Sequence, residues 1–148
     1  MNIPAGVYRG VRMLVGVDST RNVSGVQSGA LDPANGMFWT WNSGYIFAKL
    51  EAKSPVSTAP LQNVTYHIGG FKAAQSSLQW VVLNFPSSIT LSDTGKAHVE
   101  LSADLDKWFN ASNAIKIANE PFCMDPGSLA QRISTNYAHM FTVLSVTH

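Results

Sequence analysis

Histidine and methionine are the residue types in this sequence best suited to hold a metal ion. None of the four histidines pairs with another at the spacing of a helical or finger-type site, so the fold itself must assemble any metal site. His67 comes just before a Gly-Gly pair, where a backbone or a ligand can approach closely, and His139 stands beside Met140. Imidazole with thioether is a donor set suited to copper, particularly Cu(I). The candidate metal ligands are His67, His139, Met140 and Met37.

The same residues have ordinary structural interpretations. A histidine at the C-terminal end of a helix often interacts only with the helix dipole, and a buried methionine usually fills a gap in the core. Trp39 and Trp41 stand two residues apart in a predicted strand, so both rings point to one face together with Met37. Core packing, an exposed platform for a glycan and a redox role all fit this pair.

Oxygen-bearing side chains gather in the long loop that precedes these tryptophans. They are Asp18, Asn22, Asp32 and Asn35. Carboxylate and amide oxygens are ligands for Ca²⁺, and a calcium-stapled structural surface domain is therefore one alternative function. No EF-hand spacing is present, and Asx turns explain the same residues at least as well.

Composition narrows the classes of function. The formal charge of +1 and the low charged content give no electrostatic reason to expect nucleic acid as a partner, and one cysteine, Cys123, excludes an internal disulfide framework. There is no apolar run long enough for a membrane span, and the first residues do not resemble a signal peptide. No Gly-x-Ser-x-Gly elbow is present, and Cys123 has no histidine near it in the sequence, so we expect a binding protein and no enzyme.

Alternating apolar and polar residues predict short strands separated by loops rich in Gly, Pro and Ser. The predicted strands include residues 7–17, 44–52, 63–68, 78–85, 89–91, 96–101, 114–118 and 141–146. Residues 78–85 are apolar on both faces, which predicts a central strand that Pro86 ends. Asp125 as N-cap and Pro126 as first helical residue predict a helix that runs to about His139. These patterns predict an all-β fold, a β-sandwich of about seven short strands with one late α-helix, in a single domain over residues 1–148.

Several separated motifs, in one order along the chain, resemble the MbnP-like proteins, a family named after a methanobactin-associated copper protein. The motifs are Gly16-Val17-Asp18, Asn22-Val23-Ser24-Gly25, Gly29-Ala30-Leu31-Asp32-Pro33, Gly36-Met37-Phe38-Trp39-Thr40-Trp41-Asn42-Ser43-Gly44-Tyr45, His67-Ile68-Gly69-Gly70-Phe71 and Asn136-Tyr137-Ala138-His139-Met140-Phe141. The resemblance implies an extracytoplasmic bacterial β-sandwich, periplasmic or at the cell surface and often a lipoprotein. It further implies that the protein binds copper and works beside a MauG-like dihaem enzyme that oxidises a tryptophan to kynurenine.

Two departures from the family pattern bear on the site. The chain resembles the C-terminal two-thirds of a family member, which predicts that the leader and the first strands are absent from it. Related copper sites use a tryptophan two residues before a histidine, whereas here Trp39 is followed two residues later by Trp41. The positions that carry over are the segment of Trp39 and Trp41, as modified or redox residues, and His67 as a ligand.

Overall fold

The computed structural model describes residues 3–40 and 42–147, and within them it contains eight strands and one helix of ten residues. The strands are β1 (Gly6–Val15), β2 (Phe38–Thr40), β3 (Gly44–Lys53), β4 (Asn63–Gly69), β5 (Gln79–Leu91), β6 (His98–Ala103), β7 (Phe122–Cys123) and β8 (Phe141–Thr147). The helical segments are α1 (Ser19–Val23), α2 (Ser128–Tyr137) and the 3-10 turns η1 (Gly29–Leu31), η2 (Pro33–Asn35), η3 (Pro60–Gln62), η4 (Ala73–Gln75) and η5 (Leu105–Trp108). The predicted all-β class with one late α-helix is confirmed, with eight strands in place of about seven.

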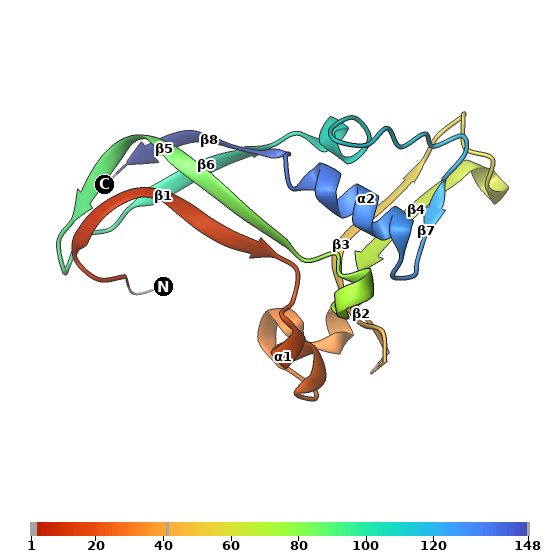
Figure 1. Ribbon diagram of the computed structural model, residues 1–148, viewed down its shortest axis with the longest axis horizontal. Helices are drawn as coiled ribbons and strands as arrows, with labels where there is room; N and C mark the ends of the chain where they lie inside the picture. The colour runs from red at the N-terminus through yellow and green to blue at the C-terminus, as the bar shows by residue number, and fades with distance from the viewer. Residues whose placement is uncertain (1–2, 41, 148) are drawn as a thin grey trace.

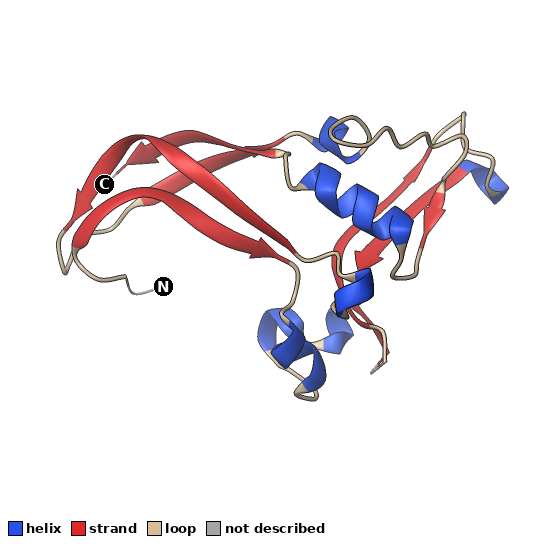
Figure 2. Cartoon of the chain, in the orientation of Figure 1, coloured by secondary structure: helices blue, strands red, loops and turns tan. Residues whose placement is uncertain are grey.

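The strands form three small sheets (Figures 1 and 2). β1 pairs with β5, β6 pairs with β8, and these two antiparallel ribbons meet where β5 contacts β8. The third sheet has the order β2-β3-β4-β7, and α2 packs on it through β4. None of the described helices has the length and apolar character needed to cross a membrane.

β5 differs from the prediction, because it continues through Pro86 to Leu91. Proline has no N–H to donate to a strand ladder and is tolerated where the ladder is irregular. The register of β1 against β5 shifts between Tyr8, opposite Ile89, and Gly10, opposite Asn84, so Pro86 falls in that irregular stretch. The predicted strand at 89–91 is therefore the end of β5. In the described chain β5 pairs only with β1, so the prediction of a central strand was wrong.

The segment before α2 also departs from the prediction. Residues 114–118 form no strand, since Ala114 makes a single bridge to Asn110 and the Lys116 carbonyl accepts two backbone hydrogen bonds of a turn. The short strand β7 lies further on and pairs parallel to β4. α2 begins at Ser128 with Gly127 as its N-cap, later than the predicted cap at Asp125.

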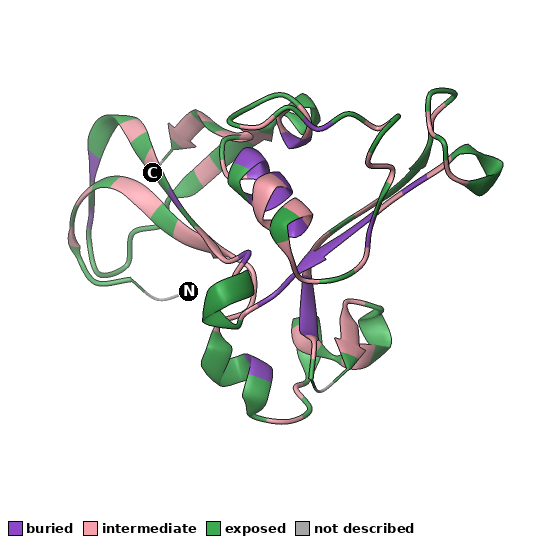
Figure 3. Ribbon diagram, turned by 45° about the vertical axis from the view of Figure 1, so that its right-hand side comes forward, coloured by how far each residue is buried: buried purple, intermediate pink, exposed green. Residues whose placement is uncertain are grey.

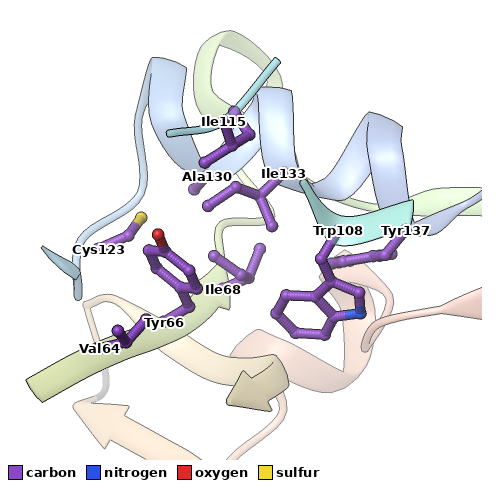
Figure 4. Packing of buried hydrophobic residues seen from close by; sticks show 9 residues of the cluster. All are labelled: Val64, Tyr66, Ile68, Trp108, Ile115, Cys123, Ala130, Ile133 and Tyr137. Carbon is purple, nitrogen blue, oxygen red and sulfur yellow. The ribbon is translucent and has the colours of Figure 1, made fainter. Parts of the chain in front are cut away.

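The hydrophobic core lies between α2 and β4 (Figures 3 and 4). Its buried members are Val64, Tyr66, Ile68, Trp108, Ile115, Cys123, Ala130, Ile133 and Tyr137. Alternation along β4 supplies Val64, Tyr66 and Ile68 to this side, because successive side chains of a strand point to opposite faces. The Tyr66 hydroxyl donates to the Glu120 carbonyl at 2.6 Å, which satisfies the one polar atom of that side chain.

The long loop between β1 and β2 holds α1, η1 and η2 and is fastened by a buried asparagine. The Asn22 amide nitrogen donates to the Val17 carbonyl at 2.6 Å, and its oxygen accepts from the Tyr45 N–H at 3.0 Å. Gly44, at φ +79°, leaves room for that oxygen, since a side chain there would meet it. Asn22 thereby ties the loop to the first residues of β3.

Candidate metal site

His67 lies on the face of β4 opposite the core. Its neighbours Tyr66 and Ile68 point toward α2, so the period of two directs the imidazole to the other side of the sheet. The residue is 8% exposed, and its Nε2 lies 2.8 Å from Glu51 Oε1. A buried polar ring needs such a partner, and the carboxylate of Glu51 provides it.

Glu51 and Lys49 come from the neighbouring strand and share this face. In the antiparallel pairing of β3 with β4, Lys49 stands opposite His67 and Glu51 stands opposite Thr65. Lys49 Nζ lies 3.3 Å from the same Oε1 atom that contacts the imidazole. The hydrogen bond with His67, followed by that with Lys49, lowers the pKa of Glu51 below its ordinary value. The carboxylate is therefore ionised at neutral pH and accepts from two donors.

Trp39 lies on the same face, against Gly69. A Cβ atom at Gly69 would stand 2.7 Å from Trp39 Cζ3 and 3.0 Å from Cη2, so only glycine lets the indole approach this closely. Gly69 is two residues beyond His67 on β4 and points to the same side. The close approach predicted for the Gly-Gly pair is thus made by an indole ring. Its Nε1 is buried and has no hydrogen-bond partner among the described residues.

His139 and Met140 lie on the other side of β4. His139 is an exposed residue after α2, and its Nε2 is 3.3 Å from Ser112 Oγ. Met140 packs against the core between α2 and β4. Because the strand separates them from His67, these three predicted ligands do not come together.

Met37 and Trp41, on either side of β2, are the remaining candidates from the sequence. Met37 is half-buried just before β2, and its carbonyl accepts from the Ile46 N–H at 2.9 Å. Trp41 lies outside the described residues, so the predicted pairing of its ring with Trp39 is untested. The register of β2 against β3 is irregular around Trp39.

The described residues supply one suitable ligand for a copper ion, but not a complete set. His67 offers an imidazole that is already oriented by a carboxylate, which is the arrangement in which metal-ligating histidines are held. Within residues 3–40 and 42–147, no three His, Cys, Asp or Glu side chains gather as a metal-binding group. Copper at His67 would therefore take further ligands of another kind, such as thioether or water.

Three of the four loop side chains accept a backbone hydrogen bond through an oxygen. Asp18 Oδ1 accepts from Arg21 N–H at 3.0 Å, and Asp32 Oδ1 accepts from the N–H of Ala34 at 2.9 Å. The side-chain amide of Asn35 donates to the Gly29 carbonyl at 2.9 Å. Asp18 and Asp32 are therefore caps, and Asn35 and the buried asparagine described above tie the loop together, so each of the four side chains has a structural contact of its own.

Sequence reasoning did not select Glu51 and Lys49 as site residues. Alternation within β3 placed both on one face, but their proximity to His67 depends on which residues of β3 and β4 face each other. Register between strands is a long-range property. The missing signal therefore lay in the strand pairing and not in any local motif.

Comparison with known families returns one match. The family model of MbnP matches residues 1–125, a range that covers β1 to β7 and with it Trp39, Glu51 and His67. Comparisons with curated proteins and with solved structures found no match. The matched range ends before α2, so the predicted motif at 136–141 lies outside it. Because the model covers well over half of the sequence, the chain belongs to the MbnP family.

Proposed function

We propose that this protein is an extracytoplasmic copper-binding protein without enzymatic activity, with His67 as its principal ligand. Membership in the MbnP family supports the proposal, and the family resemblance favours the periplasm or the cell surface as its location. Imidazole is a ligand type that suits copper. A MauG-like dihaem protein is the partner that the same resemblance favours.

The observation that carries the proposal is the combination of His67 and Trp39 on one face of β4. His67 is 8% exposed and held by Glu51, whereas the indole of Trp39 packs on Gly69 two residues further along. A core face would bury both rings among apolar residues, as the opposite face of β4 does. Here an oriented imidazole and an oxidisable ring share a surface that also carries charged groups.

The placement of the other candidates restricts the ligand set. His139 and Met140 lie across β4 from His67, so they do not complete a site centred on it. Met37 precedes the strand that carries Trp39 and remains a candidate thioether ligand. Bound copper would supply a redox-active cation, and the chain's part is to hold it through His67 next to the Trp39 ring.

Trp39, which lies on the face of β4 that carries His67, is the proposed target for oxidation by the dihaem partner. Conversion of its indole to kynurenine consumes one O₂ and one water and releases the C2 carbon as formate, so it needs the partner's oxidising chemistry. The new carbonyl and aromatic amine would lie on the face of His67 as extra donors. Among the described residues its buried Nε1 has no hydrogen-bond partner, and the ring packs on Gly69.

Copper titration of the purified protein tests the ligand assignment. His67→Ala should abolish tight binding, whereas His98→Ala, at an exposed position on β6, should leave it as in wild type. Circular dichroism and a melting curve establish that both variants fold. Unchanged affinity in His67→Ala would place the copper elsewhere.

Mass spectrometry of the peptide spanning residues 36–49 tests the modification. Protein from its own host, with the dihaem partner expressed, should carry the mass of kynurenine at one tryptophan, and recombinant protein made without the partner should not. Fragment ions distinguish Trp39 from Trp41. An unmodified peptide from the host would remove the oxidation from the proposal and leave the copper site to the titration.

A further inference from the structure

We infer that Glu51 is a positioning residue that holds His67 in its Nε2–H tautomer and so leaves Nδ1 as the atom that binds copper. The tautomer follows from the hydrogen bond between Glu51 and His67. The assignment of Nδ1 to copper rests on the proposed function. The two statements therefore need separate measurements.

The tautomer is determined by the type of partner. Glu51 Oε1 lies 2.8 Å from His67 Nε2, within hydrogen-bond distance. An ionised carboxylate has no hydrogen to donate and can only accept, so the proton of this bond belongs to the imidazole. A neutral His67 then carries its one proton on Nε2 and its lone pair on Nδ1.

Lys49 also holds the carboxylate in place. Its Nζ lies 3.3 Å from the same Oε1, so this oxygen is shared by an ammonium group and an imidazole. Both partners are set by the pairing of β3 with β4, in which Lys49 stands opposite His67. The carboxylate is 56% exposed at its side chain, so the two contacts and not burial fix its orientation.

This arrangement matches the way in which proteins orient metal-ligating histidines. Such a histidine usually donates its second ring N–H to a carboxylate, which selects the tautomer and makes the coordinating nitrogen more basic. Loss of such an outer partner typically weakens metal binding by about 10- to 100-fold. Glu51 would thus act on copper through His67 and without contacting it.

Nuclear magnetic resonance of the metal-free protein tests the tautomer. Long-range ¹H–¹⁵N spectra of ¹⁵N-histidine-labelled protein, with His67 assigned from its absence in His67→Ala, should show the proton on Nε2. Glu51→Ala should give a mixture of tautomers, and Lys53→Met, at an exposed position of the same strand, should retain the wild-type signal. An Nδ1–H tautomer in wild type would overturn the inference, as would an unchanged spectrum in Glu51→Ala.

Titration with Cu(I) and Cu(II) tests the consequence for binding. Glu51→Ala should bind about 10- to 100-fold more weakly than wild type, and Lys53→Met should stay close to wild type. Both substitutions are at the surface of β3, and melting curves check that the fold is intact. Wild-type affinity in Glu51→Ala would overturn the positioning role. A wild-type chain that binds no copper would overturn both the proposed function and the Nδ1 assignment, and the spectra would still decide the tautomer.

Discussion

The two faces of β4 carry different chemistry on adjacent residues. Toward α2, Tyr66 and Ile68 are fully buried in the apolar core, where the hydroxyl of Tyr66 is satisfied by a backbone carbonyl. Away from α2, His67 contacts an ionised carboxylate, and an indole packs on Gly69. One strand thus contributes alternately to the stability of the fold and to the candidate site.

The difference shows where each kind of substitution should act. A residue of the inner face contributes apolar area and close packing, so its loss is felt in the free energy of unfolding. A residue of the outer face makes few, specific polar contacts that a bound ion can use. The inner face of β4, toward α2, should therefore determine the stability of the fold. The outer face, which carries His67, should determine the affinity for copper.

The strongest test substitutes two neighbours on β4. Ile68→Ala removes a fully buried side chain and should lower the free energy of unfolding by about 2–5 kcal/mol, with copper affinity of the folded protein unchanged. His67→Ala should abolish tight copper binding and lower the free energy of unfolding by less than Ile68→Ala does. Urea denaturation and copper titration of both variants measure the two effects. Equal losses of stability would contradict the distinction between the faces.

The thiol of Cys123 provides a second test of the inner face. Burial raises the pKa of Cys123 to about 11, and the residue belongs to the core beside Tyr66. Only the thiolate is nucleophilic, and at pH 8 a rise from 9.0 to about 11 reduces the thiolate fraction by about 100-fold. Alkylation should accordingly be at least that much slower in native than in urea-unfolded protein.

Copper provides the control for this measurement. If the metal binds on the outer face, loading the protein with copper leaves the alkylation rate of native Cys123 unchanged. Protection by copper would instead make the thiol a ligand and place the site in the core.

The sequence predicts the local part of this site well. Alternation along residues 63–68 placed His67 opposite Tyr66, and the Gly-Gly pair predicted a close approach, which the structure assigns to Trp39. Both features depend on residues close together in the sequence. The prediction that Asx turns explain the loop residues is local in the same sense. Asp18 and Asp32 each accept a hydrogen bond from an N–H two or three residues further along the chain.

The parts that the sequence does not predict depend on long-range pairing. The contact between Glu51 and His67 requires the register of β3 against β4, and no local pattern encodes it. The prediction that His139 and His67 share a site was wrong, because α2, which leads to His139, packs on the other face of β4. The continuation of β5 past Pro86 likewise depends on an irregularity in its pairing with β1.

Gly69→Ala tests the contact that brings the indole to the outer face. The new methyl would stand 2.5 Å from the Tyr45 carbonyl oxygen of β3 and 2.7 Å from Trp39 Cζ3, so the strand and the ring must both move, at an expected cost of about 1–3 kcal/mol. The emission assigned to Trp39, by difference from Trp39→Phe, should shift. Gly6→Ala is the matched control, since among the described residues a Cβ there would meet only the Tyr8 ring, at an ordinary 3.8 Å. Unchanged emission in Gly69→Ala would show that the ring is not held against β4.

The smallest effect is expected in the loop that leads to Trp39. Asp32 Oδ1 accepts from the Ala34 N–H at 2.9 Å as the N-cap of η2, so Asp32→Ala should lower the free energy of unfolding by about 0.5–1 kcal/mol. Asp93→Ala, at an exposed position in the turn between β5 and β6, should have a smaller effect. Because the cap uses the carboxylate directly, chelators should leave the melting temperature of wild type unchanged, and calcium should not raise it. A melting temperature that falls with a chelator and recovers with calcium, and with no transition metal, would instead show that these oxygens hold an ion and would restore the calcium-stapled alternative.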